Sequence, residues 1–292
     1  MTITAILLAF GLCYLFRDLA RLHRFEWLAG YVRQAHRLLG RLPGGSGAPG
    51  FLILLLLPLV AVGLLNGLAE GLLGALGAFL FAVLVLIYTF GPHDLDTDIE
   101  AIIHAGDDAA QARAMENLVG QRPPDAEAGM APAVKAVFRE ALERWFGTIF
   151  WFAVLGVFGA VLYRLADRIT AGGIELSPAQ ASLFRRLRQV LEWPVAQLMT
   201  LALGLATDFD SVHKAWKEYH DEQGHGLFEG DNGFLYAAAT RIVLSGDAAK
   251  DGYADQLSGP LAGLRQAMDL IWRVLGVWLT ALAILLLVDV VA

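Results

Sequence analysis

Cysteine is almost absent from this chain of 292 residues, in which Cys13 is the only one. A single cysteine excludes an intrachain disulfide and a cysteine-based metal cluster, and we expect Cys13 to pack as a small apolar residue. The sequence also lacks the glycine-rich phosphate loop, a GxGxxG turn after a strand, the HExxH zinc motif and the GxSxG nucleophile elbow. It therefore gives no support to an ATPase, a dinucleotide-dependent enzyme, a zinc protease or an α/β-hydrolase.

Charged residues are also scarce: they make up 17% of the chain, against 57% hydrophobic residues, and the mean hydropathy is +0.54. The formal net charge of −7 is unevenly distributed. Residues 17–50 contain six arginines and two carboxylates, whereas residues 91–147 contain eleven carboxylates and five basic residues. Nucleic-acid binding needs a basic face, so we expect no nucleic-acid partner. The high hydropathy indicates a few membrane spans with modest soluble parts.

One long apolar stretch, Phe51–Phe90, contains forty residues and a single charge, Glu70. A bilayer core about 30 Å thick takes about 20 apolar residues to cross as a helix, and backbone in lipid must be hydrogen-bonded within its own segment. The stretch therefore predicts two helical crossings with a tight turn at Glu70, in an integral membrane protein. The glycines of this stretch predict close packing of the two helices: Gly63, Gly67 and Gly71 stand four apart, and Gly74 and Gly77 follow.

The segments before this hairpin differ in character. Met1–Phe16 is apolar but short for a crossing, and is either a short first span or an amphipathic anchor. Arg17–Gly50 is rich in arginine and carries aromatic residues, which is typical of a helix lying on the headgroup surface. Its six arginines predict that this flank, and with it Gly91–Gly147 after the hairpin, is cytoplasmic.

The acidic run after the hairpin begins with Asp94, Asp98 and Glu100. It is not an EF-hand, because the sixth and twelfth loop positions would be Ile99 and Ala105 instead of glycine and glutamate. Thr97 and Glu100 match a capping box, which predicts a helix over Ile99–Gly120; a cation or ligand role for the carboxylates is the alternative. Gln121–Pro132 is predicted to be a loop.

From Ala133 apolar residues recur at helical spacing, with Glu140 and Arg144 placed as an i,i+4 pair. The simplest interpretation is one continuous helix that enters the membrane at Trp145. A single crossing would however place five arginines outside the cell, against the positive-inside rule. A re-entrant turn would keep them inside, and the single crossing and the re-entrant turn both remain open. These arginines are Arg164, Arg168, Arg185, Arg186 and Arg188.

Ser177 and Gln180 predict the capped start of the next helix, which would expose Arg188 and break at the Glu192-Trp193-Pro194 triplet. Val195–Ala206 is too short to span and is predicted to be re-entrant or buried. A final span closes the chain at Asp269–Ala292.

These patterns predict an all-α, polytopic helical membrane protein with cytoplasmic or interfacial amphipathic helices. The predicted segments are 1–50, an apolar segment and Arg-rich interfacial helix; 51–90, a transmembrane hairpin; 91–147, an acidic cytoplasmic helical region; 148–166, a central span; 167–268, amphipathic helices and loops; and 269–292, a C-terminal span.

Several segments resemble the AmpE family of inner-membrane proteins linked to β-lactamase induction. Gly91–Glu100 looks like the Pro-Arg-Asp-Leu-x-x-Asp-x-Glu start of that family's central region, and the block Arg144–Arg164 is similar to its central span. Val190–Pro194 corresponds to its Leu-x-Trp-x-Pro-like element, and Gly230–Gly233 with 237–239 to its last soluble helix. The resemblance covers most of the chain from about residue 91, and the second block is its most specific part.

The AmpE family is related to the membrane-bound cobinamide-phosphate synthases, CobD and CbiB, and the chain resembles these in Phe150–Arg164. It departs from them where their chemistry is thought to lie. Their Asn-Thr-x-Asp is Glu140–Glu143 here, their Asn-Thr after Tyr-Arg is Ala166-Asp167, and their Pro-Asn-Ala-Gly is matched only by Asn232. The resemblance therefore implies the synthase scaffold without an evident reaction.

The function implied by the resemblance is an inner-membrane regulator, similar to AmpE, in β-lactamase induction and the response to β-lactam or cell-wall stress. The alternatives are a cobinamide-phosphate-synthase-like enzyme and a carrier of an anionic cell-wall fragment. We expect the lipid bilayer as a partner, with a cell-wall-derived ligand or another membrane or cytoplasmic protein as further candidates, and the glycine-rich hairpin offers a route to oligomers.

The sequence predicts no catalytic residue, no metal and no cofactor. The candidate ligand-binding residues are charged or polar side chains close to the predicted spans or within the matched motifs. They are Asp94, Asp98, Glu100, Glu140, Glu143, Arg144, Arg164, Asp167 and Asn232.

Overall fold

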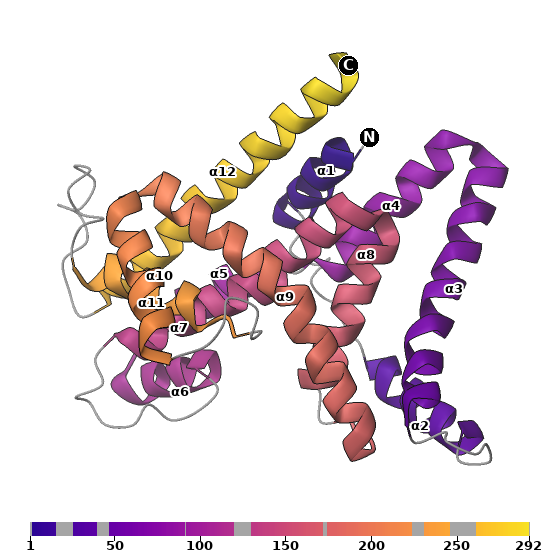
Figure 1. Cartoon of the computed structure of the whole chain (residues 1–292), viewed down its shortest axis with the longest axis horizontal. Helices are drawn as coiled ribbons and strands as arrows, with labels where there is room; N and C mark the ends of the chain where they lie inside the picture. The colour runs from indigo at the N-terminus through magenta and orange to yellow at the C-terminus, as the bar shows by residue number, and fades with distance from the viewer. Residues whose placement is uncertain are drawn as a thin grey trace. The chain divides into compact units, whose positions relative to one another are not determined.

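The computed structural model describes residues 2–15, 26–39, 47–90, 92–119, 130–171, 174–223, 231–245 and 261–291, and every regular element in these ranges is helical. The predicted all-helical fold is confirmed. The chain divides into two compact units (Figure 1). The first unit comprises residues 1–91 and 147–192, and the second comprises residues 92–146 and 193–292.

Three helical stretches are long and apolar enough to cross a membrane: Ala48–Leu73, Ala131–Ala171 and Ala262–Leu285. The first of them, α3, leaves a continuous band of leucine exposed, and a soluble protein rarely exposes so large an apolar surface. The band continues onto α4. Its large exposed members are Leu52, Ile53, Leu56, Leu57, Val60, Leu64, Leu65, Leu68, Leu72, Leu73, Leu76, Leu80 and Leu84.

The apolar stretch forms a hairpin of α3 (Ala48–Leu73) and α4 (Ala75–Thr89), which meet at a turn and separate away from it (Figure 1). The turn lies at Gly74, with φ +61° and ψ −147°, and not at Glu70 as expected. This backbone conformation is open to glycine and almost closed to residues with a Cβ. A charged residue at the middle of the run was therefore a poorer marker of the turn than a glycine.

Only some of the glycines expected to bring the two helices together do so. A Cβ on Gly77 would lie 2.0 Å from the Ala69 carbonyl oxygen, so this glycine permits the close approach of the two helices. Gly67 and Gly71 have no atom within 4 Å of a Cβ position, and Gly63 lies against the Phe158 ring. The predicted close packing is therefore made at Gly77, whereas Gly67 and Gly71 take no part in it, because spacing does not tell which face of α3 meets α4.

A second reversal occurs inside α8 (Gly147–Ala171), at Gly156, whose φ is +61° and ψ −146°. A Cβ on Gly147 would lie 2.1 Å from the Tyr163 ring. Residues sixteen positions apart would be separated by about 24 Å in a straight helix, so the chain folds back on itself at Gly156. One continuous helix from Ala133 through the central stretch is therefore excluded, and the alternative of a turn is realised.

The two reversals share a sequence. Leu73–Ala78 and Leu155–Ala160 both read Leu-Gly-x-x-Gly-Ala. In each repeat the first glycine has a positive φ. The second glycine lies close to the carbonyl of the residue five positions before the first glycine: Gly77 to that of Ala69, and Gly159 to that of Trp151. The repeat therefore encodes the same tight helical turn twice in the first unit.

The remaining helices of the first unit surround these hairpins. The helix α1 (Thr2–Leu15) packs against α4 and α8, and its Cys13 is buried, as expected. The helix α2 (Glu26–Leu39) is amphipathic as predicted, since Leu28 and Val32 are buried while Arg33 and Arg37 are exposed. An edge-on contact between Phe51 and Phe184, with ring centroids 4.8 Å apart, joins α3 to α9 (Pro178–Ala206) in the core.

The helix α9 (Pro178–Ala206) starts at the predicted capping box. The Gln180 N–H donates to Ser177 Oγ over 3.2 Å, and the Ser177 N–H donates to Gln180 Oε1 over 3.3 Å. Contrary to prediction, α9 continues through Pro194. Proline leaves carbonyls of the preceding turn without their helical donor, and Trp151 Nε1 donates to the Leu191 carbonyl nearby, over 2.9 Å.

The second unit contains α5 (Pro92–Ile103), α6 (Asp108–Val119), α7 (Ala131–Ala141), a π-helical turn η3 (Leu142–Phe146), α10 (Phe209–Gln223), α11 (Gly233–Leu244) and α12 (Ala262–Val291). Its core includes edge-on contacts of Trp145 with Trp272 and of Phe146 with Trp278, at 5.2 and 5.1 Å between ring centroids. These contacts pack the π-helical turn against α12.

The start of the second unit corrects the predicted capping box. The helix α5 begins at Pro92, so Thr97 and Glu100 lie inside it instead of capping it. The predicted helix over Ile99–Gly120 is two helices, and Asp107 caps the second: its Oδ1 accepts the Ala110 N–H over 2.6 Å. Of the predicted loop over Gln121–Pro132, residues 121–129 lie outside the described ranges.

Candidate functional site

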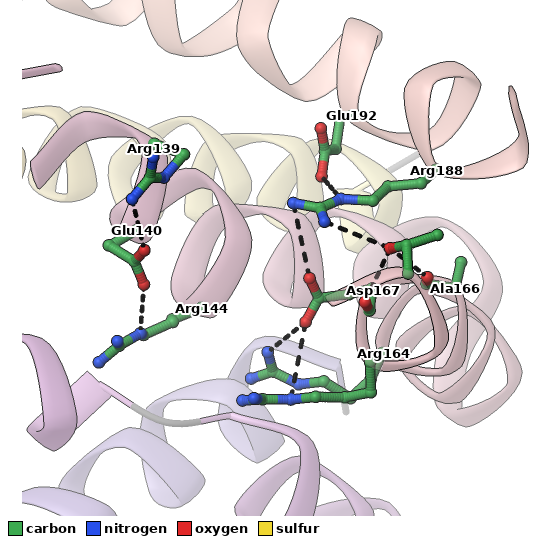
Figure 2. A network of polar contacts seen from close by, with 10 residues as sticks. Arg139, Glu140, Arg144, Arg164, Ala166, Asp167, Arg188 and Glu192 are labelled. Carbon is green, nitrogen blue, oxygen red and sulfur yellow. Dashed lines mark hydrogen bonds and ion pairs between the residues drawn. The ribbon is translucent and has the colours of Figure 1, made fainter. Parts of the chain in front are cut away.

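In the second unit, Arg144 belongs to an ion-paired cluster of four residues, the Arg144 cluster, with Asp98, Arg139 and Glu140. Its Nε donates to Glu140 Oε2 over 2.8 Å, and its Nη1 donates to Asp98 Oδ2 over 2.9 Å. Arg139 Nη2 binds the other oxygen of Glu140 over 3.2 Å, as Figure 2 shows, and also donates to the Leu118 carbonyl over 3.1 Å. The cluster therefore links α5 and α6 to α7 with balanced charge.

The π-helical turn η3 contains Arg144 and Glu143. Single π-helical turns within α-helices are often found at functional sites. Here the predicted i,i+4 pair of Glu140 and Arg144 is formed across the boundary between α7 and this turn. Both side chains are only 16% and 23% exposed, so the pair is shielded better than an ordinary surface ion pair.

Replacing Arg144 with glutamine should lower the free energy of unfolding by about 1–2 kcal/mol, because two charge-assisted hydrogen bonds are lost while Glu140 stays half-buried. Denaturant titration in detergent micelles measures the change. Arg113→Gln is the matched control, since Arg113 is exposed on α6 and bonds the carbonyl of Ala109 in its own helix. Equal stability of the two variants would contradict a structural role for the cluster.

In the first unit, Asp167 is the centre of a second, more deeply buried cluster (Figure 2). Arg164 Nη1 donates to Asp167 Oδ2 over 3.3 Å, and Arg188 Nη2 lies 3.7 Å from Oδ1. The side chains of Arg164 and Asp167 are only 3% and 5% exposed. Arg164 Nε also donates to the Thr89 carbonyl over 2.6 Å, which ties α8 to the end of α4.

Arg188 extends this cluster along α9. Its Nε donates to Glu192 Oε1 over 2.5 Å and its Nη1 to Thr170 Oγ1 over 3.2 Å. The prediction that Arg188 is exposed was wrong: its side chain is 20% exposed, because Asp167 and Glu192 draw it inward. Arg188 and Glu192 are the residues that sequence reasoning missed, although their i,i+4 spacing was a usable signal.

A polar groove of about 1200 Å³ lies between α7, α10 and α11 of the second unit. Three cations and three carboxylates line it, together with two tyrosines. Arg241 pairs with Glu218, and Lys135 Nζ lies 5.6 Å from the centre of the Tyr236 ring. The sequence did not reveal this groove, because its lining comes from helices about eighty residues apart. The charged and aromatic lining residues are Lys135, Arg139, Arg241, Glu218, Glu222, Asp231, Tyr219 and Tyr236.

Tyr219 connects the groove to the start of α11. Its hydroxyl donates to Asp231 Oδ2, while Asp231 Oδ1 accepts the Gly233 N–H over 2.9 Å. Burial, then the hydrogen bond to Asp231 and its charge, raise the pKa of Tyr219 from 10.0 to about 12. A Cβ on Gly233 would lie 1.9 Å from the Tyr219 hydroxyl oxygen, so only glycine fits there without displacing the tyrosine.

Gly233→Ala should therefore return the pKa of Tyr219 from about 12 towards 10, because the displaced hydroxyl leaves Asp231. A tyrosine with a raised folded-state pKa stabilises the fold below pH 10, and this contribution is lost as the pH rises through 12. Ultraviolet absorbance during alkaline titration measures the tyrosinate. Tyr219→Phe is the control, because it removes the tyrosine that titrates at the highest pH. A titration profile of Gly233→Ala that equals the wild-type profile would contradict the contact between Gly233 and the Tyr219 hydroxyl.

The remaining candidate residues lie apart from these contacts or outside the described side chains. The side chain of Asp94 is outside the described part, and Glu100 is exposed on α5. Glu143 is half-buried in the π-helical turn, and Asn232 is buried just before α11, at the groove's α11 end. Six of the nine candidates are thus placed: Asp98, Glu140 and Arg144 in the Arg144 cluster, Arg164 and Asp167 in the Asp167 cluster, and Asn232 at the start of α11.

Within the described ranges, no three His, Cys, Asp or Glu side chains are grouped closely enough to hold a metal ion. Comparison with known proteins finds no matching family model, no similar curated protein and no similar solved structure. The chemistry of the site therefore has to be inferred from its own contacts.

Proposed function

We propose that the protein is a multi-pass regulator of the bacterial inner membrane, similar to AmpE, that acts in β-lactamase induction and the response to cell-wall stress. The observation that supports a regulator over an enzyme is the pairing of the candidate side chains. Asp98, Glu140 and Asp167 are each held by arginine. A general acid or base must come within hydrogen-bond reach of the proton it transfers, whereas oxygens of these carboxylates are engaged by arginine N–H groups.

The ligand of this regulator is proposed to bind the polar groove of the second unit. Lys135, Arg139 and Arg241 offer partners for carboxylates or phosphate, and Glu222 and Asp231 offer partners for an amino group. Charge-assisted hydrogen bonds of both kinds suit a zwitterionic ligand. A cell-wall fragment that carries a peptide has this combination of groups.

The proposed membrane topology follows from the two hairpins of the first unit. Each returns the chain to the side it left, so the basic helix α2, the acidic segment 92–146 and the arginines after Gly156 share one side. This arrangement satisfies the positive-inside rule with that side cytoplasmic. In this topology α12 crosses once, and the second hairpin is re-entrant, since Arg164 is only eight residues, about 12 Å of helix, from Gly156.

Cysteine labelling tests this topology, because Cys13 is the only native cysteine. In a Cys13→Ala background, cysteines at the exposed positions Ala109 and Glu175 should both react with a membrane-impermeant maleimide only after the cells are opened. The two positions flank the second hairpin. Labelling of one in intact cells and not the other would exclude a re-entrant turn at Gly156.

The regulatory function is tested in the bacterium that encodes the protein. Deletion of the gene should change the β-lactamase activity induced by a β-lactam, and a plasmid copy should restore it. Arg241→Gln, which alters the groove, should fail to restore induction, whereas Lys217→Gln, exposed on α10 outside the groove, should succeed. Unchanged induction in the deletion strain would refute the proposed function.

A further inference from the structure

A second cavity, of about 530 Å³, lies within the first unit and is almost entirely apolar. It is lined by α2, α3, α4 and the part of α8 after Gly156. Its volume is in the range of small-molecule sites, roughly 300–1,000 Å³. Apolar side chains cover its deep part, and examples are Ala61, Leu65, Phe81, Leu84 and Val161.

The few polar groups of this cavity are concentrated at one end. Trp27 Nε1 donates to the Tyr88 hydroxyl over 2.6 Å, and Arg164 Nε donates to the Thr89 carbonyl over 2.6 Å. Tyr88 and Thr89 form the last turn of α4, whereas Phe81 lies two turns nearer the hairpin turn at Gly74. The cavity is therefore amphipathic along its length, with a polar mouth and an apolar depth of about 10 Å.

The arrangement of the helices explains why the cavity exists. The helices α3 and α4 meet at Gly74 and separate away from it (Figure 1). The part of α8 after Gly156 contacts both of them, since Phe158 lies against Gly63 of α3 and Arg164 bonds the Thr89 carbonyl of α4, and the cavity lies among these helices and α2. Apolar cavities without polar partners stay free of water and take up apolar molecules, and the surrounding α3 surface is exposed leucine.

We propose that this cavity binds one acyl chain of an anionic membrane phospholipid, with the headgroup at the mouth beside Trp27 and Tyr88. Tryptophan and tyrosine favour the headgroup level of a bilayer. The helix α2, which supplies Trp27, exposes Arg33 and Arg37, and basic side chains at the membrane surface attract anionic headgroups. The inference requires the membrane location but not the regulatory function.

Native mass spectrometry of the full chain, purified in a mild detergent, tests the occupant. The wild-type protein should retain one phosphatidylglycerol-type lipid per chain. Ala61→Phe, which places a ring in the cavity, should lower this occupancy about tenfold. Leu64→Phe is the matched control: Leu64 is 71% exposed on the same helix and does not line the cavity, so the occupancy should stay that of the wild type.

A titration of the delipidated protein tests the headgroup. Phosphatidylglycerol should bind more tightly than phosphatidylcholine, and Arg33→Gln and Arg37→Gln should each reduce this preference about fivefold. These exposed substitutions leave the cavity intact, so they test the proposal even if Ala61→Phe fails to fold. The proposal is overturned if the wild type retains no lipid, if both phospholipids bind equally, or if the retained molecule is a polyprenyl phosphate.

Discussion

Replacing Asp167 with alanine should lower the free energy of unfolding by about 3–5 kcal/mol, the cost of leaving a buried charge without its partner. Arg164 is 3% exposed and would lose the carboxylate it pairs with, and Arg188 would lose one of its two carboxylates. The pair also joins α8 to α4 through the Thr89 carbonyl, so the loss should loosen the base of both hairpins. Denaturant unfolding in mixed micelles, followed by tryptophan fluorescence, measures the change.

A double substitution separates the lost pair from other damage. Arg164→Met with Asp167→Leu removes both charges and keeps apolar volume, and should recover a large part of the stability, because apolar replacements of buried ion pairs are often neutral. Glu175→Gln is the surface control and should change the stability by less than about 0.5 kcal/mol. If Asp167→Ala is as stable as this control, the Asp167 cluster does not stabilise the packing of α8 against α4.

Gly159→Ala should destabilise the protein by about 1–3 kcal/mol or more, because its Cβ would lie 2.0 Å from the Trp151 carbonyl oxygen, which is backbone and cannot move aside. Gly77→Ala should have the same effect, since its Cβ would meet the Ala69 carbonyl at the same distance. The paired substitutions test whether the repeated Leu-Gly-x-x-Gly-Ala sequence encodes one turn in two places.

The opposite sign is expected for Gly67→Ala. Nothing lies within 4 Å of its Cβ position, and glycine to alanine in a helix interior stabilises by about 0.5–1 kcal/mol. Thermal unfolding of the three variants in one detergent compares them directly. A stabilised Gly159→Ala would contradict the close contact with Trp151, and a strongly destabilised Gly67→Ala would mean that α3 and α4 approach each other along the evenly spaced glycines.

Local signals in the sequence predicted several features that the structure retains. The capping box of Ser177 with Gln180 starts α9 as expected, since both partners are three residues apart and need no other element. The same reasoning failed for Thr97, because the helix that contains it begins earlier, at Pro92. The proline at position 194 did not end α9, which continues to Ala206 although proline removes one helical hydrogen bond.

The pairing of Glu140 with Arg144 was predictable from i,i+4 spacing, whereas the addition of Asp98 was not. The Asp167 cluster shows the same limit: the sequence offered Arg164 and Asp167 as neighbours, but their burial depends on α4 and α9. The polar groove could not be predicted from the sequence, because its charged side chains come together only when three helices pack against one another.

The composition and the lengths of the apolar runs determined by themselves that this chain is helical and that it has helices able to cross a membrane. Both properties depend on local sequence, because backbone in lipid must be hydrogen-bonded within its own segment and because the length of a helix follows from its number of residues. The tertiary structure decided where the chain reverses, which glycines bring helices together and which charges are paired. These features depend on which face of each helix packs against which neighbouring helix, and that is decided by contacts between segments that are distant in the sequence.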